Sequence, residues 1–169
     1  MDATELRAMQ APIKDRYKSD PGAALITLKA KGSLDDQSIA CKVETGRALA
    51  VAGLHPATGG SGAELCSGDM LLEALVACAG VTLKAVSTAL AIPLKSGTVS
   101  AEGDLDFRGT LGVDKSAPVG FRDIRLAFEL DTDAPQEKVD QLLKLSERYC
   151  VVYQTLNHRP ELSSTLSRG

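Results

Sequence analysis

The chain has 169 residues, of which 44% are hydrophobic, 24% are charged and only 4% are aromatic, and it contains no tryptophan. At about 150 residues per domain, this length predicts one domain over residues 1–169 with an aliphatic core. The net charge of −3 provides no basic excess for binding phosphate groups, so we expect no nucleic-acid partner.

The longest apolar run argues against a membrane protein. It extends from Met70 to Leu90 and contains Glu73, Lys84 and three hydroxyl residues, unlike an ordinary membrane span. The first residues, MDATELRAMQAPIKDRYKSD, lack the basic and apolar regions of a signal peptide. We therefore expect a cytoplasmic protein with no membrane partner.

The N-terminal third predicts a polar arm followed by a small sheet. Residues 1–20 form the arm, with at most a short helix over residues 3–10 that stops at Pro12. Three short strands separated by turns follow, over residues 24–30, 38–44 and 47–52, with the turns at 32–37 and at Gly46. Strands in such quick succession indicate an antiparallel meander.

A glycine-rich loop and a long helix come next. The loop, residues 53–68, matches no phosphate-binding motif and is compatible with either a surface connection or an active-site lid. The helix is predicted over residues 69–91, with Ser67 as its N-cap and Pro93 as its stop. Its polar residues share one narrow stripe, formed by Glu73, Lys84, Ser87 and Thr88. Since the other faces are aliphatic, a sheet and a second copy of the chain should bury this helix on most sides.

The C-terminal half predicts two long strands and a second helix. The strands cover residues 98–109 and 120–131, joined by a proline-containing connection. The second strand alternates, so one face should be buried, formed by Ile124, Leu126, Phe128 and Leu130. The helix covers residues 136–150 and carries an apolar stripe of Val139, Leu142, Leu143, Tyr149 and Cys150. With residues 162–166 as a last edge strand, the order of elements predicts an α+β domain.

Four cysteines are present, namely Cys41, Cys66, Cys78 and Cys150, and none belongs to a C-x-x-C pattern, so we expect no zinc or other metal site. Cys78 and Cys150 lie on the two helices that should pack on the same sheet, so their thiols could meet in the core. They could be inert core residues or a redox pair. A reactive thiol needs a nearby cation or helix N-terminus. Cys78 lies more than two turns into its own helix, so an arginine would have to come from elsewhere.

The segments GDMLLEALVACAGVTL and SERYCVV resemble the OsmC/Ohr family, the osmotically inducible and organic-hydroperoxide-resistance proteins. The family pattern has a carboxylate, an apolar run, a cysteine on a central helix and a second cysteine downstream. Here Cys78 and Cys150 are 72 residues apart, and the order of elements fits from residue 22 to residue 166. The resemblance implies an OsmC-like fold, with antiparallel sheets packed around a long central helix, and an intertwined homodimer with active sites at the subunit interface.

The resemblance also implies a chemistry that needs no metal, haem or other cofactor. Cys78 matches the peroxidatic cysteine, whose thiolate attacks an organic hydroperoxide and becomes a sulfenic acid. Cys150 matches the resolving cysteine, which condenses with that acid to form a disulfide. A dithiol reductant, lipoyl-type in the best-known members, then reduces the disulfide by exchange.

Other residues match the family pattern less directly. Asp69 stands where the family has a carboxylate before the central helix, although an acid there also suits the positive end of a helix. The thiolate-stabilising arginine lies in the N-terminal portion of the family, where Arg16 and Arg47 are the candidates and solvated surface arginines are the alternative. Cys66 is either a bystander or a competing resolving thiol.

The preferred hypothesis is a thiol-dependent peroxidase that reduces organic hydroperoxides. Because a fold does not fix a function, two alternatives stay open. The first is a non-catalytic protein of the same fold that binds a small apolar ligand at the dimer interface. The second is a purely structural oligomer with unreactive thiols.

Overall fold

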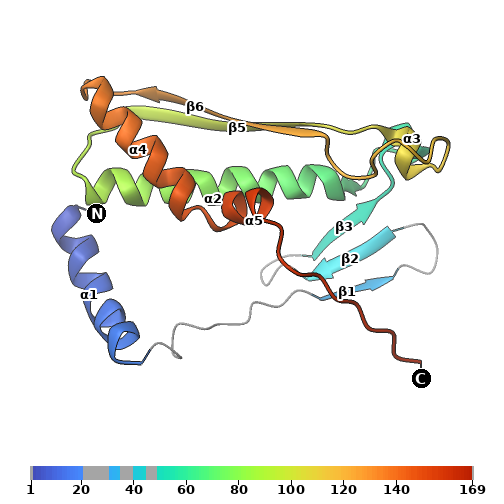
Figure 1. Ribbon diagram of the computed structural model, residues 1–169, viewed down its shortest axis with the longest axis horizontal. Helices are drawn as coiled ribbons and strands as arrows, with labels where there is room; N and C mark the ends of the chain where they lie inside the picture. The colour runs from blue at the N-terminus through green and yellow to red at the C-terminus, as the bar shows by residue number, and fades with distance from the viewer. Residues whose placement is uncertain (1, 21–30, 35–39, 45–48, 169) are drawn as a thin grey trace.

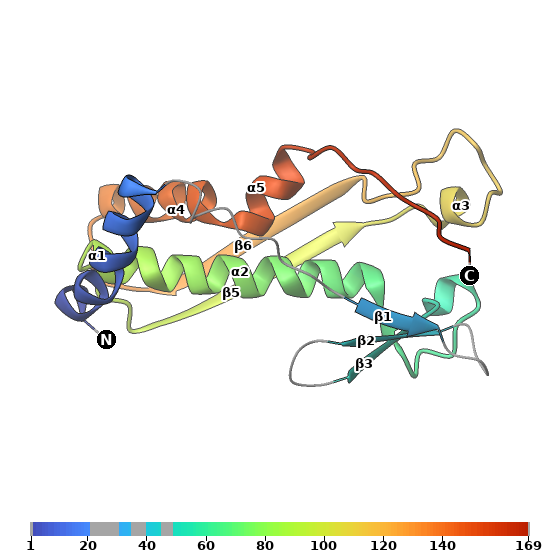
Figure 2. The ribbon, with the colours of Figure 1, turned by 90° about the horizontal axis from the view of Figure 1, so that it is seen from below.

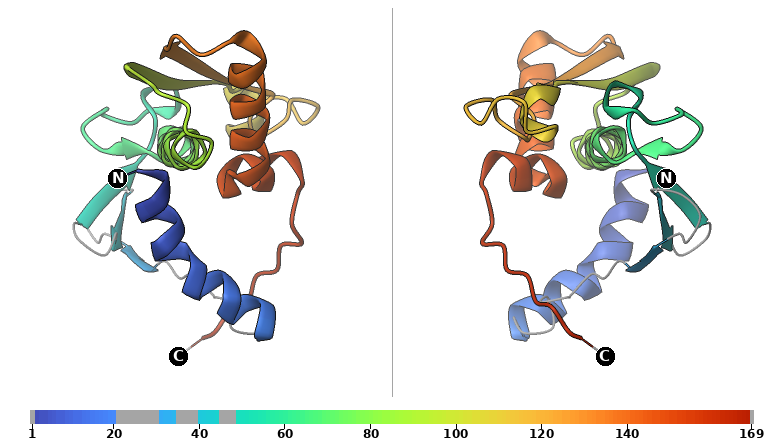
Figure 3. Two further views of the ribbon diagram at one scale, coloured as in Figure 1. Left: turned by 90° about the vertical axis from the view of Figure 1, so that its left-hand side faces the viewer. Right: turned by 90° about the vertical axis from the view of Figure 1, so that its right-hand side faces the viewer.

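The long helix α2 (Ser67–Ala89) is the centre of the computed structural model, which describes residues 2–20, 31–34, 40–44 and 49–168. It runs along an antiparallel pair of strands, β5 (Ser96–Asp104) and β6 (Asp123–Asp131), and contacts α4 (Gln136–Tyr149) and α5 (Val151–Asn157) (Figure 1; Figure 2). In the views along α2 in Figure 3, the helix is flanked by the β5–β6 layer and by α4. The predicted α+β class is confirmed.

A second, four-stranded sheet lies at the N-terminal end of α2 (Figure 1). Its strands are β1 (Lys31–Leu34), β2 (Ala40–Glu44), β3 (Leu49–Gly53) and β4 (Leu65–Cys66). The first three pair antiparallel in sequence order, and β4 pairs parallel with β3. β2 and β3 overlap the second and third strands of the predicted meander and pair antiparallel as expected.

The boundaries of this sheet differ from the prediction, and the predicted loop over 53–68 contains Gly53 of β3 and the whole of β4. The turn predicted for 32–37 is wrong for residues 32–34, because Gly32 pairs with Val43 inside the β1–β2 ladder. The strand predicted over 24–30 and the turn at Gly46 lie outside the described residues.

The N-terminal arm is a 17-residue helix, α1 (Ala3–Ser19), so the short helix predicted to stop at Pro12 is wrong. The side chain of Asp2 accepts a hydrogen bond from the backbone N–H of Glu5, and the side chain of Glu5 accepts one from the backbone N–H of Asp2, both at 2.8 Å. This capping box satisfies two amides of the first turn. Leu6 is buried, and α1 contacts α2, so Pro12 costs one backbone hydrogen bond without ending the helix.

The loop between β3 and α2 contains a short 3-10 helix, Pro56–Thr58, which ends at Gly59 with φ +92°. Such a left-handed backbone favours glycine. Helix α2 then starts two residues earlier than predicted: Ser67, the predicted N-cap, is already helical, and Cys66 is the N-cap and makes no side-chain cap bond. At the other end, the helix stops before Ala91, whose φ is +53°, and Pro93 follows as predicted.

One line of residues on α2 is buried, formed by Leu75, Ala79, Leu83 and Ser87. Ser87 was expected on an exposed polar stripe, and that expectation is wrong, since its side chain is only 1% exposed. Its hydroxyl donates to the carbonyl of Lys84 at 3.0 Å, which satisfies it inside the fold. By length and composition α2 is also apolar enough to cross a membrane, but this buried line shows how a core helix uses the same composition.

The two long strands pair over their whole length, from Ser96 opposite Asp131 to Asp104 opposite Asp123. The residues of β6 alternate as predicted, and the less exposed ones pack against the core clusters: Ile124, Leu126, Phe128 and Leu130. The first strand is shorter than predicted, because Asp106 caps a one-turn helix, α3 (Phe107–Thr110), through a bond from the N–H of Arg108.

The second predicted helix is confirmed as α4, but the chain then turns and starts a new helix. Cys150 has an extended backbone, with φ −74° and ψ 110°, and separates α4 from α5. Tyr149, assigned to the apolar stripe, is exposed instead, because α4 ends there. The edge strand predicted over 162–166 is wrong: residues 158–168 form neither helix nor strand, and Leu162 and Leu166 are exposed.

Candidate functional site around Cys78 and Cys150

The structure brings Cys78 and Cys150 together in one apolar cluster. Cys78 lies in the middle of α2 and is half-buried, whereas Cys150 lies at the α4–α5 junction and is only 1% exposed. Their side chains are in hydrogen-bonding contact. The cluster around them is built from α2, the β5–β6 sheet and α5, and includes Leu75, Ala79, Val99, Leu126, Phe128, Val152 and Tyr153.

The surroundings of Cys78 favour its thiolate. Burial raises the pKa of this thiol, but the backbone N–H of Val152, the Cys150 thiol, the N–H of Val151 and the Thr82 hydroxyl all donate to its sulfur. Together these donors hold the pKa of Cys78 below its ordinary value. Two of these donors are backbone amides of the first turn of α5.

The environment of Cys150 acts in the opposite direction. Burial raises the pKa of this thiol, and so does the neighbouring Cys78, whereas the N–H of Tyr153 lowers it. The net result is a pKa above the ordinary value of a cysteine. The Tyr153 amide donates to the Cys150 sulfur at 3.4 Å, which makes Cys150 the cap of α5. The pair is thus asymmetric, because the pKa of Cys78 is lowered and the pKa of Cys150 is raised.

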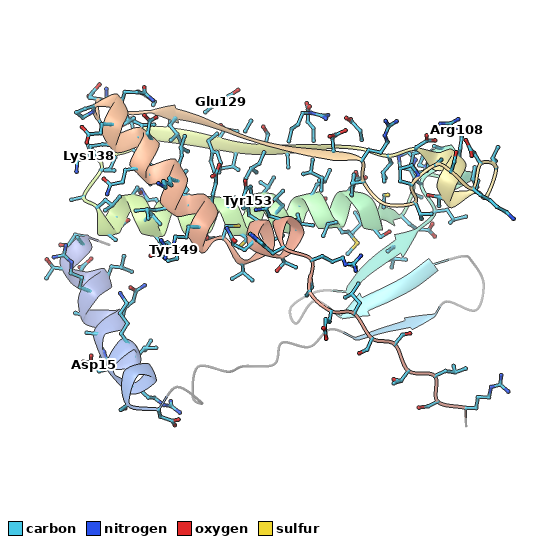
Figure 4. All side chains as sticks on the ribbon, viewed as in Figure 1. Asp15, Arg108, Glu129, Lys138, Tyr149 and Tyr153 are labelled. Atoms are coloured by element: carbon cyan, nitrogen blue, oxygen red, sulfur yellow. The ribbon has the colours of Figure 1, made fainter. Side chains whose placement is uncertain are left out.

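A cavity of about 390 Å³ adjoins this cluster. Four cluster residues line it: Leu75, Ile124, Leu126 and Tyr153. Phe121 and Leu156 extend its apolar wall, and its polar lining comes from Arg122, Asp123, Glu147 and Asn157. Figure 4 shows Tyr153 on the side of α5 that faces the β5–β6 sheet, with Tyr149 on the opposite side. An apolar molecule in this cavity would therefore lie against the residues that surround both sulfur atoms.

A glycine lets one wall of this cavity form. A Cβ at Gly103 in β5 would approach the ring of Phe121 to 2.5 Å, closer than packed atoms allow. The absence of a side chain at Gly103 therefore permits Phe121 to pack directly over the strand.

Two of the other predicted site residues do not reach Cys78 within one chain. Asp69 is exposed in the first turn of α2. It precedes Cys78 by nine residues of helix, which separates the two residues by about 13.5 Å along the helix axis and half a turn around it. Arg16 is exposed in the last turn of α1, where its carbonyl accepts from Ser19 and Asp20. Figure 4 shows the neighbouring Asp15 at the end of α1 that points away from α2. Arg47 lies outside the described residues.

The remaining thiol described by the structure belongs to a different region. Cys66 is half-buried at the start of α2, about 18 Å along the helix from Cys78. It lines a separate cavity with His55, whose ring stacks on Phe107 at a centroid distance of 4.9 Å. Among the described residues, no three His, Cys, Asp or Glu side chains gather as a metal site would require.

Sequence reasoning missed two kinds of donor at this site. Thr82 follows Cys78 by four residues on the same helix, so helical spacing alone could have identified it. The amides of Val151 and Val152 carried no such signal, because the apolar run after Cys150 gives no sign that the helix restarts there.

Comparison with known proteins identifies the fold. A model of the OsmC-like protein family matches residues 60–165. The chain is 16% identical to an OsmC-like protein from Mycoplasma pneumoniae, with a TM-score of 0.65 over 79% of this chain and 89% of that one. It is also 16% identical to an organic hydroperoxide resistance protein OsmC from Legionella pneumophila, with a TM-score of 0.61 over 79% and 91%.

A third similar structure is an organic hydroperoxide resistance protein from Elizabethkingia anophelis, at 15% identity and a TM-score of 0.62 over 80% of this chain and 91% of that one. A comparison with curated proteins gave no match. Identities this low establish the shared fold rather than a shared activity, and the family match covers the central helix and both cysteines of the pair. The chain therefore belongs to the OsmC-like protein family, as its resemblance to OsmC/Ohr sequences predicts.

Proposed function

We propose that this protein is a thiol-dependent peroxidase that reduces organic hydroperoxides. The observation that carries the proposal is the contact between Cys78, with a lowered pKa, and Cys150, with a raised pKa. A nucleophile must be a thiolate at neutral pH, and a resolving thiol must stay available until the first oxidation has occurred. Two similar structures are those of organic hydroperoxide resistance proteins, which supports the same chemistry.

The proposed cycle needs only the two thiols, the hydroperoxide and a dithiol. The Cys78 thiolate attacks the terminal oxygen of R–O–O–H, so that an S–O bond forms while the O–O bond breaks. Sulfur loses two electrons and becomes a sulfenic acid, and the alkoxide takes a proton from water and leaves as the alcohol. The Cys150 thiol then displaces water from the sulfenic acid and forms the disulfide. A lipoyl-type dithiol returns both thiols by exchange and is itself oxidised to its disulfide.

The apolar part of the cavity wall, which includes Leu75, Phe121 and Leu156, supports a substrate with an apolar group. An apolar group that buries about 100 Å² there would gain about 2.5 kcal/mol, or nearly two decades in kcat/KM. Hydrogen peroxide has no such surface and would lose hydration on entering. The proposed substrate is therefore an organic hydroperoxide with an apolar substituent.

We further propose that the protein works as a homodimer in the cytoplasm. Large apolar side chains are exposed on α2, at the end of α4 and at the start of α5: Leu71, Val81, Tyr149 and Val151. Exposed apolar side chains on the helices around Cys78 and Cys150 favour a protein–protein interface there. Any role of Asp69 or Arg16 at the thiols requires a second copy, because neither reaches Cys78 within its own chain.

The direct test is turnover of cumene hydroperoxide by the purified, reduced protein with dihydrolipoamide. We expect multiple turnovers, none with Cys78→Ser, and a kcat/KM for hydrogen peroxide that is lower by one to two decades. Binding of cumene hydroperoxide without turnover would contradict the proposal and favour the non-catalytic ligand-binding alternative. Thiols that resist alkylation until the protein is unfolded would contradict it in favour of a structural oligomer.

A further inference from the structure

Four residues form the boundary between the two thiols and the neighbouring cavity of about 390 Å³. Each of them packs in the apolar cluster around Cys78 and Cys150 and also lines the cavity: Leu75, Ile124, Leu126 and Tyr153. Three of the four are aliphatic, so the Tyr153 hydroxyl is the only side-chain hydrogen-bond donor at this boundary in the described part of the chain. A molecule that extends from the cavity to the sulfur atoms crosses a boundary at which this hydroxyl is the one donor.

The backbone of α5 ties the position of Tyr153 to that of the thiol pair. Tyr153 lies in the first turn of α5, and its N–H donates to the sulfur of Cys150 at 3.4 Å. The residue is half-buried and packs against the buried cluster of Leu75, Ala79 and Cys150, against which Cys78 also packs. The side chain of Tyr153 is therefore held beside both cysteines, on the side of α5 that faces the β5–β6 sheet (Figure 4).

The hydroxyl of Tyr153 is free to bind a ligand. Among the described residues it has no hydrogen-bond partner, and no buried side-chain oxygen or nitrogen atom there lacks one, so this hydroxyl is accessible rather than sealed in the core. A tyrosine with its ring in apolar surroundings usually finds a partner for its hydroxyl. Because Tyr153 lines the cavity, a ligand bound there is placed to be that partner.

In the proposed reaction, the oxygen atom that needs a donor is the one that leaves. When the Cys78 sulfur attacks the terminal oxygen of R–O–O–H, a substituent R in the cavity puts the inner oxygen between the cavity and the sulfur. This inner oxygen becomes negatively charged as the O–O bond breaks. A hydrogen bond to a charged oxygen is stronger than one to a neutral oxygen, so a donor at this point stabilises the transition state more than the bound hydroperoxide.

We propose that Tyr153 is a further catalytic residue, whose hydroxyl donates a hydrogen bond to the inner oxygen of the hydroperoxide as that oxygen becomes an alkoxide. This inference rests on the proposed peroxidase function and adds the group that assists departure of the alcohol. The S–O bond forms and the O–O bond breaks, and the hydroperoxide takes up the two electrons that sulfur loses. The tyrosine keeps its own proton, and water protonates the alkoxide.

The test measures how fast an oxidant consumes the Cys78 thiol in reduced protein, without any dithiol. Samples are quenched with N-ethylmaleimide, and the labelled fraction of the Cys78 peptide is read by mass spectrometry. Tyr153→Phe keeps the ring and the amide that donates to Cys150, and it removes only the hydroxyl. Tyr149→Phe is the matched control, because Tyr149 is 60% exposed and does not line the cavity.

Two aromatic oxidants separate a catalytic role from a structural one. Cumene hydroperoxide releases a strongly basic alkoxide, whereas perbenzoic acid releases a weakly basic carboxylate that needs less stabilisation. We expect Tyr153→Phe to slow oxidation by cumene hydroperoxide about tenfold, the lower end of what a hydrogen bond to a charged group contributes, and oxidation by perbenzoic acid less than about threefold. Alkylation of Cys78 by iodoacetamide should be unchanged, and Tyr149→Phe should match the wild type in all three reactions.

The outcomes distinguish this inference from the proposed function. If Tyr153→Phe is oxidised as fast as Tyr149→Phe by cumene hydroperoxide, the role of Tyr153 is refuted and the peroxidase proposal stands. Equal slowing with both oxidants, or slower alkylation as well, would also overturn the role, because it reports a disturbed site rather than a lost donor. If neither oxidant consumes the Cys78 thiol of the wild type, the peroxidase proposal fails and the role of Tyr153 fails with it. If the expected pattern is found but dihydrolipoamide gives no turnover, the role of Tyr153 stands and the proposed reductant is wrong.

Discussion

In the first turn of α5, one hydrogen-bond donor to the Cys78 sulfur can be removed by a substitution at an exposed side chain, that of Val151. Val151 is the first residue of α5, a position that proline tolerates well because its φ is already helical. The preceding residue, Cys150, has φ −74° and ψ 110°, close to the extended backbone that a residue before proline adopts. Val151→Pro therefore deletes the N–H that points at Cys78 while α5 can still form.

The expected size of the effect follows from the donors that remain. A hydrogen bond to a charged group contributes about 1.5–3 kcal/mol, and the N–H of Val151 is a weaker contributor to the lowered pKa of Cys78 than the N–H of Val152. We therefore expect a loss of about 1 kcal/mol, which raises the pKa of Cys78 and lowers its thiolate fraction about fivefold at a pH below that pKa. Well above the pKa, where the thiolate is fully formed in both proteins, the difference should vanish.

The assay is iodoacetamide alkylation of Cys78 across pH, with Val151→Ala as the matched control. Val151 is exposed, so trimming its side chain to Ala should have little effect and leaves the N–H in place. Circular dichroism checks that α5 is retained in both variants. Coincident profiles for Val151→Pro and Val151→Ala would refute the view that the α5 amides stabilise the thiolate.

Three further results are expected. In Cys150→Ser, peroxide should leave a Cys78 sulfenic acid that dimedone traps and that excess peroxide over-oxidises to the sulfinic acid. Cys66→Ser should instead form the Cys78–Cys150 disulfide, as the wild type does. Mass spectrometry distinguishes these species, and a disulfide between Cys66 and Cys78 in Cys150→Ser would contradict the assignment of Cys150. Leu142 is 0% exposed, so Leu142→Ala should lower the free energy of unfolding, measured in urea titrations, by about 2–5 kcal/mol. Leu162 is 88% exposed, so Leu162→Ala should change this free energy by less than about 0.5 kcal/mol. Equal effects of the two substitutions would refute the described core. Light scattering should give a dimer mass for the wild type and a monomer mass for Val81→Glu. The control is Val113→Glu, in the loop after α3, which should stay dimeric although Val113 and Val81 are both 73% exposed. A monomeric wild type would refute the proposed interface.

The elements with strong periodicity could be predicted from the sequence, and those decided by tertiary packing could not. The alternation of β6 and the apolar stripe of α4 each specify one buried face, so both elements follow from local pattern, although Tyr149 of the predicted stripe is exposed and Ser146 is buried. α1 is an intermediate case: Pro12 suggested a stop, although Asp2 and Glu5 already had the spacing of a capping box. The tail at 162–166 was predicted as an edge strand, but it pairs with no strand in the described part of the chain.

The same division applies to the candidate site. That Cys78 and Cys150 could meet was a reasonable inference from two helices on one sheet. The groups that lower the pKa of Cys78 could not be inferred in this way, because they include backbone amides that become available only where the chain bends at Cys150. Arg16 and Arg47 stay predictions, because Arg16 could reach Cys78 only from a second copy of the chain and Arg47 lies outside the described residues.

The bend at Cys150 also means that the register of α4 determines whether the pair exists at all. Leu142 and Ser146 anchor α4 in the core, and Cys150 follows at the same spacing. A single inserted or deleted residue between Leu142 and Cys150 would turn the thiol by about 100° around the helix and displace it by about 1.5 Å. The composition of the chain would hardly change, yet the two sulfur atoms would separate. Length variation among relatives of this chain should therefore be absent from this half of α4 and concentrated in the loop before α2 and the exposed tail after α5.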